Sequence, residues 1–147
     1  MNLFAEPEAV TRLRSFYDTV ARGDFHAARH YPDPEFEWVE PEAAGLWFGG
    51  SHHGADAVFR EVIEPTYGRI AQFELKMGKF YEIGETVIAI GHARGRTKMT
   101  GRELDAPVAH IWTLRQGKAV HLQAYEDVAK WLDAVEEKPQ AAQGLAA

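Results

Sequence analysis

Hydrophobic residues near the start of the chain recur every three or four positions. This spacing matches the turn of an α-helix and predicts one amphipathic helix. Its apolar stripe comprises Val10, Leu13, Phe16, Tyr17 and Val20. Pro7 suits the first turn of this helix, and Gly23 suits its C-terminal end. Asp24 is then expected to cap a short second helix.

The segment 36–40 replaces helical spacing with strict alternation. Phe36, Trp38 and Glu40 therefore share one face of a predicted strand, which ends before Pro41. The two aromatic residues identify that face as the one packed on the core, so Glu40 is expected to point the same way. Burial raises the pKa of a carboxyl group and suits it to act as a general base. The alternative is a strand-end glutamate that turns into water.

The later pattern is mostly that of strands. Residues 41–54 indicate a glycine-rich loop, and a third helix is expected from about residue 55 until Pro65 bends or ends it. Apolar alternation and apolar runs then predict strands near residues 73–77, 87–90, 108–114 and 119–125. A tight turn at 116–118 joins the last two strands, and a final helix is expected at 128–135.

This order of elements predicts an α+β fold. Helices, one strand, a further helix and a run of antiparallel strands give a curved sheet with helices on one face. Such a sheet leaves a conical cavity between its layers, and a cavity of this kind suits a small, mostly apolar ligand.

The composition is that of a globular protein. Of 147 residues, 46% are hydrophobic and 12% aromatic, so we expect one domain over residues 1–138 and a disordered tail over residues 139–147. The net charge of −6 argues against binding to nucleic acid. The absence of cysteine excludes disulfides and thiolate chemistry. No run approaches the roughly 20 apolar residues of a membrane span, no signal-peptide pattern is present, and no histidine spacing predicts a metal site, so a cytoplasmic location is expected.

Several short motifs, taken in order, resemble the nuclear-transport-factor-2-like superfamily. They are Phe16-Tyr17 with Ala21-Arg22-Gly23-Asp24-Phe25, Trp38-Val39-Glu40-Pro41, Gly54-Ala55-Asp56-Ala57-Val58, Thr100-Gly101 with Ala106-Pro107, His110-Ile111-Trp112, and Gly117-Lys118 with Tyr125-Glu126-Asp127. Within this superfamily the chain is most similar to the SnoaL-like polyketide cyclase and ketosteroid-isomerase-related branch. The resemblance implies a cone-shaped, cystatin-like α+β barrel with a curved mixed sheet and N-terminal helices on its concave face. It also implies a homodimer packed through the outer face of the sheet.

The resemblance to ketosteroid isomerase implies a base but no oxyanion hole. Glu40-Pro41 falls at the position of that family's base. The tyrosine position falls on Phe16, with Tyr17 one residue away, and the aspartate position falls on Ala109. Losing one oxyanion donor typically costs about 10²–10³ in rate, so true ketosteroid isomerase activity is not expected.

The resemblance to SnoaL-like cyclases implies an acid/base aspartate at the end of the last strand, where Asp127 stands. That chemistry removes a proton next to a carbonyl without a metal or cofactor, so none is expected here. Strict alternation sets Asp127 with Tyr125 on the face opposite Glu126, and the alternative role for Asp127 is to cap the final helix. An epoxide-hydrolase-like set would combine Asp127 with Arg94 or Arg96, but its second aspartate is missing.

The leading hypothesis is a cofactor-independent acid/base enzyme of the cyclase or isomerase type. Its substrate would be an apolar carbonyl compound such as a polyketide, steroid or terpenoid. Glu40 is the expected base and Asp127 the second acid/base, with Tyr17 or His110 donating a hydrogen bond to the enolate. The expected substrate-contacting residues are Phe16, Trp38, Phe59, Arg94, Trp112 and Tyr125.

Other interpretations stay open. The protein would alternatively be a non-catalytic ligand carrier or a dimeric interaction module, and an epoxide hydrolase or dehydratase is a weaker candidate. Trp38, Trp112 and Tyr125 also suit a core or a dimer interface, and Arg94 suits an exposed strand edge. For His110, a hydrogen-bonded place at the dimer face is the favoured expectation over a catalytic one.

Overall fold

The helices predicted near the start of the chain are present. In the computed structural model, which describes residues 6–137, α1 spans Glu8–Ala21 and α2 spans Phe25–Ala28. Asp24 caps α2 as predicted, because its side chain accepts a hydrogen bond from the backbone N–H of Ala27.

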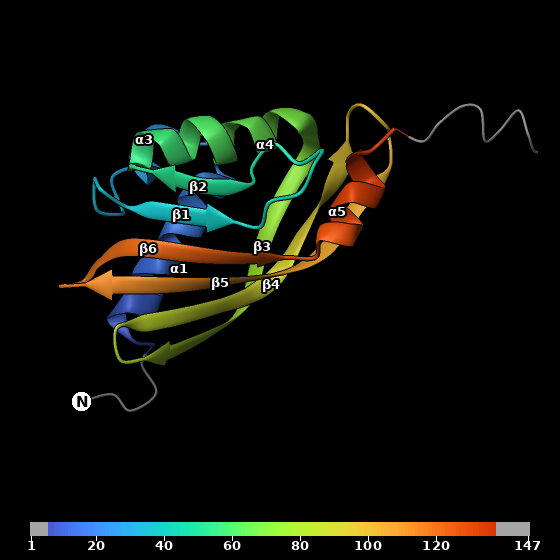
Figure 1. Ribbon diagram of the computed structural model, residues 1–147. Helices are drawn as coiled ribbons and strands as arrows, with labels where there is room; N and C mark the ends of the chain where they lie inside the picture. Colours follow the sequence, from blue (N-terminus) through green and yellow to red (C-terminus); the bar gives the residue numbers. More distant parts are fainter. Residues whose placement is uncertain (1–5, 138–147) are drawn as a thin grey trace, which may run out of the picture.

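One mixed sheet forms the body of the protein. Its strands are β1 (Glu37–Glu40), β2 (Gly50–His53), β3 (Ile70–Ile83), β4 (Thr86–Thr97), β5 (Glu103–Arg115) and β6 (Lys118–Glu126). The order across the sheet is β2-β1-β6-β5-β4-β3. Strands β1 and β6 are parallel, and the other neighbouring pairs are antiparallel. The sheet curves but does not close, which confirms the predicted α+β architecture (Figure 1).

Helices cover the inner side and one end of this curved sheet. The segments α3 (Ala55–Val58), the π-helical η1 (Phe59–Ile63) and α4 (Glu64–Arg69) follow one another as a single long helix. Both α1 and α4 contact β3, and α5 (Val128–Val135) contacts β4 and β5. Figure 1 shows α5 at the end of the sheet opposite the first turn of α1.

Two predictions about the middle of the chain were wrong. The segment predicted as a loop contains β2, which pairs with β1 in a hairpin. The third helix also continues past Pro65, because Pro65 follows the π-helical η1, where the regular i→i−4 hydrogen bonds of an α-helix are already interrupted. The helix therefore reaches Arg69 and leads directly into β3.

Other local predictions are confirmed. Gln116 and Gly117 have φ angles of 52° and 80°, which is the backbone of a two-residue hairpin turn. The final helix has the predicted bounds. Phe36, Trp38 and Glu40 are 1%, 4% and 4% exposed, so all three do face the core.

Two expectations from the sequence stay predictions, the disordered tail and the homodimer. Within residues 6–137 no helix is both long enough and apolar enough to cross a bilayer. The tail predicted at 139–147 falls outside the described residues. The homodimer stays a prediction.

Candidate active site

Three neighbouring strands bring ionisable side chains together on the inner face of the sheet. Trp38 on β1 lies opposite Leu122 on β6, and the same parallel register places Glu40 beside Ala124. Ala124 in turn pairs with His110 on β5. The small, buried side chain of Ala124 therefore stands between Glu40 and His110 and leaves room for their polar ends to approach.

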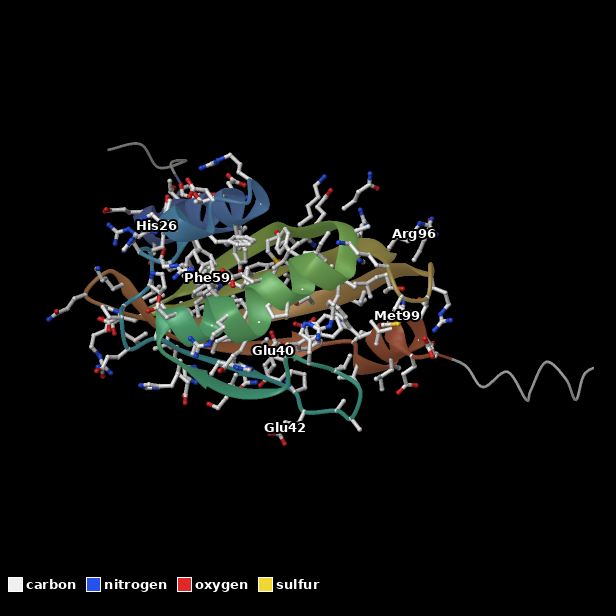
Figure 2. The ribbon with its side chains drawn as sticks, turned by 90° about the horizontal axis from the view of Figure 1, so that it is seen from above. His26, Glu40, Glu42, Phe59, Arg96 and Met99 are labelled. Atoms are coloured by element: carbon white, nitrogen blue, oxygen red, sulfur yellow. The ribbon has the colours of Figure 1, made fainter. Side chains whose placement is uncertain are left out.

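Glu40 is buried with one carboxyl oxygen unpaired. Its Oε2 accepts a hydrogen bond from the indole Nε1 of Trp38 at 2.7 Å. Its Oε1 has no hydrogen-bond partner among the described residues. Figure 2 shows Glu40 beneath the long helix, whereas Glu42 points away from the body of the protein. A buried oxygen without a partner is costly, which indicates a proton or a ligand group at this atom.

Glu126, the last residue of β6, supplies a second carboxyl group. It is partly buried, and its Oε1 accepts a hydrogen bond from the indole Nε1 of Trp131 on α5 at 3.0 Å. One polar atom from each of Glu40, Glu126 and His110 lies within 4.8 Å of the other two. The two carboxyl groups are close enough to hydrogen-bond to one another when one of them is protonated.

The pKa values of both carboxyl groups are raised. Burial raises the pKa of Glu126 from 4.5 to about 7, against the hydrogen bonds from Glu40 and Trp131 that lower it. Burial, and then the negative charge of Glu126, raise the pKa of Glu40 well above 4.5. The pair therefore loses its first proton near neutral pH and holds the second proton more tightly, because a charge on one carboxyl group disfavours a charge on the other.

His110 belongs to a buried chain of hydrogen bonds, and burial keeps its ring neutral. Trp112 donates from its Nε1 to the hydroxyl of Tyr17 at 2.8 Å, and this hydroxyl lies 2.7 Å from Nδ1 of His110. Because indole can only donate, the hydroxyl proton of Tyr17 is free to point at Nδ1. Burial lowers the pKa of His110 to about 3, so the ring carries its one proton on Nε2. Because Nδ1 is taken by the hydroxyl of Tyr17, Nε2 is the ring nitrogen that is free to donate a hydrogen bond.

Removing the hydroxyl of Tyr17 should destabilise the protein. In Tyr17→Phe, the buried N–H of Trp112 and Nδ1 of His110 both lose their partner, so we expect a loss of about 1–3 kcal/mol in the free energy of unfolding. Urea denaturation measures this loss. The matched control is Tyr125→Phe, whose ring is 57% exposed and which should change stability by less than about 0.5 kcal/mol. Equal effects of the two substitutions would contradict the hydrogen-bonded chain.

These groups border a small apolar cavity of about 60 Å³. On the same scale one water molecule needs about 10–15 Å³. Helices α1, η1, α4 and α5 and strands β1, β3, β4, β5 and β6 all contribute to the lining. None of the lining residues in the described chain is a lysine or an arginine. The lining residues are Phe16, Tyr17, Val20, Trp38, Glu40, Phe48, Val62, Ile63, Thr66, Tyr67, Phe73, Leu75, Ala93, His110, Glu126 and Trp131.

The structure brings together about half of the residues predicted for the site. Those that line the cavity are Phe16, Tyr17, Trp38, Glu40 and His110. Phe59 and Trp112 do not line it; both are 1% exposed and pack against Phe16, with ring centroids 6.4 and 5.5 Å from its ring. The placement of His110 at a dimer face was wrong, because its ring is enclosed within one chain. The roles assigned to the lining residues stay predictions.

Asp127, the predicted second acid/base, does not line the cavity. Asp127 caps α5, where its carboxylate accepts a hydrogen bond from the backbone N–H of Lys130 at 3.1 Å. The inward-facing positions of β6 are Leu122, Ala124 and Glu126, so Glu126 provides the second carboxyl group. The sequence contained the evidence for Glu126, because the same alternation of strand side chains that identified Glu40 places Glu126 and Asp127 on opposite faces of the last strand.

Two further predicted contacts lie outside the cavity. Arg94 is exposed on β4, and its Nε lies 3.3 Å from a carboxylate oxygen of Asp105 on β5. Tyr125 is exposed because it alternates with the inward-facing residues of β6. Neither side chain can contact a ligand in the cavity.

The carboxyl pair and His110 are also a possible ligand set for a divalent metal ion, since their polar atoms converge. A metal at Nε2 would require the ring proton to move to Nδ1. The hydroxyl of Tyr17 would then accept two hydrogen bonds and lose the acceptor for its own proton. The hydrogen bonds around His110 therefore fit a donor in acid/base chemistry and do not fit a metal ligand.

The family model of the SnoaL-like domain matches residues 13–122. The chain belongs to this family. The comparison with curated proteins gave no match. Among solved structures, this SnoaL-like domain is similar to an NTF2-like protein of unknown function from Burkholderia pseudomallei K96243, with 24% identity, a TM-score of 0.81, and coverage of 90% of this chain and 100% of that one.

Two other structures show the same fold. A proposed SnoaL-like polyketide cyclase from Jannaschia sp. CCS1 has 14% identity and a TM-score of 0.78, with 94% of this chain and 100% of that chain covered. A protein with a ketosteroid isomerase-like fold from Catenulispora acidiphila DSM 44928, in complex with trimethylamine, has 17% identity and a TM-score of 0.72, with 89% and 94% covered. These likenesses support the recognition of the fold made from the sequence motifs.

Proposed function

We propose that this SnoaL-like domain is a cofactor-independent acid/base enzyme of the cyclase or isomerase type, and that its substrate is a small apolar carbonyl compound. One observation carries this proposal. Two carboxyl groups with unequal pKa values converge with a neutral histidine at a cavity that is otherwise mostly apolar. Unequal neighbouring acids are the arrangement that provides a base and an acid at the same pH.

The proposed first step is removal of a proton from the carbon next to the substrate carbonyl. The carboxylate of Glu126 takes the proton, and the electron pair of the broken C–H bond moves onto the carbonyl oxygen. The Nε2–H of His110 and the retained proton of Glu40 then donate hydrogen bonds to the developing enolate oxygen. This assignment moves the role of base from Glu40 to Glu126, because Glu40 keeps its proton at the pH where Glu126 has lost it.

The second step distinguishes the two reaction types. In an isomerase, Glu126 returns its proton to a different carbon of the enolate. In a cyclase, the enolate carbon attacks a second carbonyl of the same substrate, and Glu40 protonates the alkoxide that forms. Neither series of reaction steps requires an oxidant or a cofactor.

The cavity favours a small substrate. At about 60 Å³ it holds a compact molecule without rearrangement. A polycyclic polyketide, steroid or terpenoid would require the ring of Trp131 to move away, together with its contacts to Phe48 and Phe73 at 4.9 and 6.3 Å between centroids. We therefore expect a compound with one ring or a short chain.

Hydrogen–deuterium exchange tests the proposed first step without knowledge of the natural substrate. Small cyclic ketones and enones are incubated with the protein in D₂O, and exchange next to the carbonyl is followed by NMR. Wild type should accelerate exchange of at least one compound, and Glu126→Gln should slow it by about 10²–10⁴-fold. The rate should rise as the pH approaches about 7 and level above it, since the base is Glu126.

The matched control is Glu42→Gln, which replaces an exposed carboxylate just beyond β1 and should leave exchange unchanged. Exchange that persists in Glu126→Gln would contradict the assignment of the base. Ketones that bind without exchanging would favour the non-catalytic carrier instead.

A further inference from the structure

The ionisable groups that line the cavity are acidic or neutral. The pair of Glu40 and Glu126 carries one negative charge above about pH 7, and His110 and the two tyrosines, Tyr17 and Tyr67, are uncharged near neutral pH. The lining contains no basic side chain within the described chain. A ligand that carried a carboxylate or phosphate would therefore lie next to like charge without a counter-ion, whereas a ligand that carries one positive charge would be neutralised.

The hydrogen bonds of the carboxyl pair leave one buried oxygen, Oε1 of Glu40, without a donor among the described residues. The indole of Trp38 occupies Oε2 of Glu40, and the indole of Trp131 occupies Oε1 of Glu126. Oε1 of Glu40 is buried and has no partner among the described residues, although Glu40 itself is only 4% exposed. A carboxylate oxygen in this position requires a single donor, which is either a proton shared with Glu126 or an N–H or O–H of a ligand.

The walls next to the pair are aromatic. Trp38 and Trp131 contact the two carboxyl groups directly, and Phe48 and Phe73 flank Trp131 and also line the cavity. Aromatic rings attract the alkyl groups of an ammonium ion, because these groups share its positive charge.

We infer that the cavity binds a protonated tertiary amine with small apolar substituents. Its single N–H donates to Oε1 of Glu40, its charge is neutralised by the carboxyl pair, and its alkyl groups contact the aromatic wall. The remaining proton of the pair then lies on Glu126, so the pair carries one negative charge against the one positive charge of the amine. This inference goes beyond the proposed reaction and does not depend on it, because it concerns binding alone.

Three small probes of nearly equal shape separate charge from hydrogen bonding. N,N-dimethylethanolamine carries both the positive charge and the N–H, choline carries the charge without the N–H, and 3-methylbutan-1-ol carries neither. Titration calorimetry at about pH 8, where the pair has lost a proton, should rank their affinities in that order. We expect the amine to bind about ten- to a hundredfold more tightly than the alcohol.

Variants connect this ranking to the assigned oxygen. Glu40→Gln keeps the shape, but with its amide oxygen accepting from Trp38 it places an NH₂ donor where Oε1 stands. It should therefore weaken amine binding at least tenfold and leave the alcohol unchanged. Unchanged binding of the alcohol also shows that the variant retains its cavity. The control Glu42→Gln should bind all three probes as wild type does.

Two results would overturn the inference. The first is that the alcohol binds as tightly as the amine or more tightly. The second is that choline binds as tightly as the tertiary amine, which would show that the N–H does not contribute to binding. Its failure is distinguishable from failure of the proposed reaction. Amine binding without ketone exchange would contradict only the proposed reaction. Ketone exchange without amine binding would contradict only the inference about amine binding.

Discussion

Replacing Glu126 with glutamine should make the protein more stable at alkaline pH while removing its proposed activity. The pKa of Glu126 is about 7 in the folded protein against 4.5 for the exposed group, mainly because burial penalises the charged form. The unfolded chain therefore loses this proton at lower pH than the folded protein does. The contribution of protonated Glu126 to the free energy of unfolding is fully present below about pH 4.5 and is lost as the pH rises to about 7. This shift in the pKa of Glu126 corresponds to a loss of at most about 3 kcal/mol in the free energy of unfolding, and partial exposure of the side chain reduces the loss.

Glutamine keeps an oxygen that can accept the hydrogen bond from Trp131 but carries no charge. The free energy of unfolding of Glu126→Gln, relative to wild type, should therefore increase by about 2–3 kcal/mol between about pH 5 and pH 8. Urea denaturation of both proteins across this range measures the difference. Glu42→Gln, at an exposed position, should show no such trend. A difference that is the same at every pH would mean that Glu126 is not held in an environment that disfavours its charge.

This first prediction links stability to function. A site that keeps two acids together in apolar surroundings lowers the stability of the fold, and neutral substitutions at such sites often stabilise a protein while they abolish activity. A stabilised, inactive Glu126→Gln would therefore support a functional reason for the carboxyl pair.

Replacing Gly91 with alanine should cause the largest loss of stability. Gly91 on β4 faces the irregular part of β3, where the register shifts between Met77 and Lys79. A Cβ atom at Gly91 would lie 1.9 Å from the carbonyl oxygen of Lys76 and 2.7 Å from the Cα of Met77. Both are backbone atoms of a paired strand, so they cannot move aside without breaking the pairing. We expect a loss of about 4 kcal/mol or more in the free energy of unfolding.

The same irregularity offers a matched control at Gly78. A Cβ atom there would have no other atom within 4 Å, so Gly78→Ala should change stability by less than about 1 kcal/mol. Thermal and urea unfolding of the two variants compare the same substitution at two nearby glycines. A Gly91→Ala protein as stable as Gly78→Ala would show that the two strands are not packed as closely as the structure describes.

The sequence alone determined the elements whose cause is local. The bounds of α5, the hairpin turn at Gln116 and Gly117, and the cap at Asp24 all follow from residue types within a few positions of one another. The burial of Glu40 also followed, because Trp38 and Phe36 share its strand and its face. Predictions failed where spacing was irregular, as at β2 and at the π-helical turn before Pro65.

Only the tertiary structure decided how these parts form a site. The parallel pairing of β1 with β6 brings Glu126 to Glu40, and no local spacing relates two strands so far apart in the chain. The choice of Glu126 over Asp127 depended on where β6 ends and α5 begins, since the residue at that junction caps the helix and its neighbour faces the cavity. The neutral state of His110 depended on its burial where α1 packs on β5, and Tyr17 on α1 provides the hydrogen-bond partner of its Nδ1. Strand alternation tells which face a side chain takes, but pairing between distant segments sets which charges meet there, and those meetings determine the pKa values on which the proposed chemistry depends.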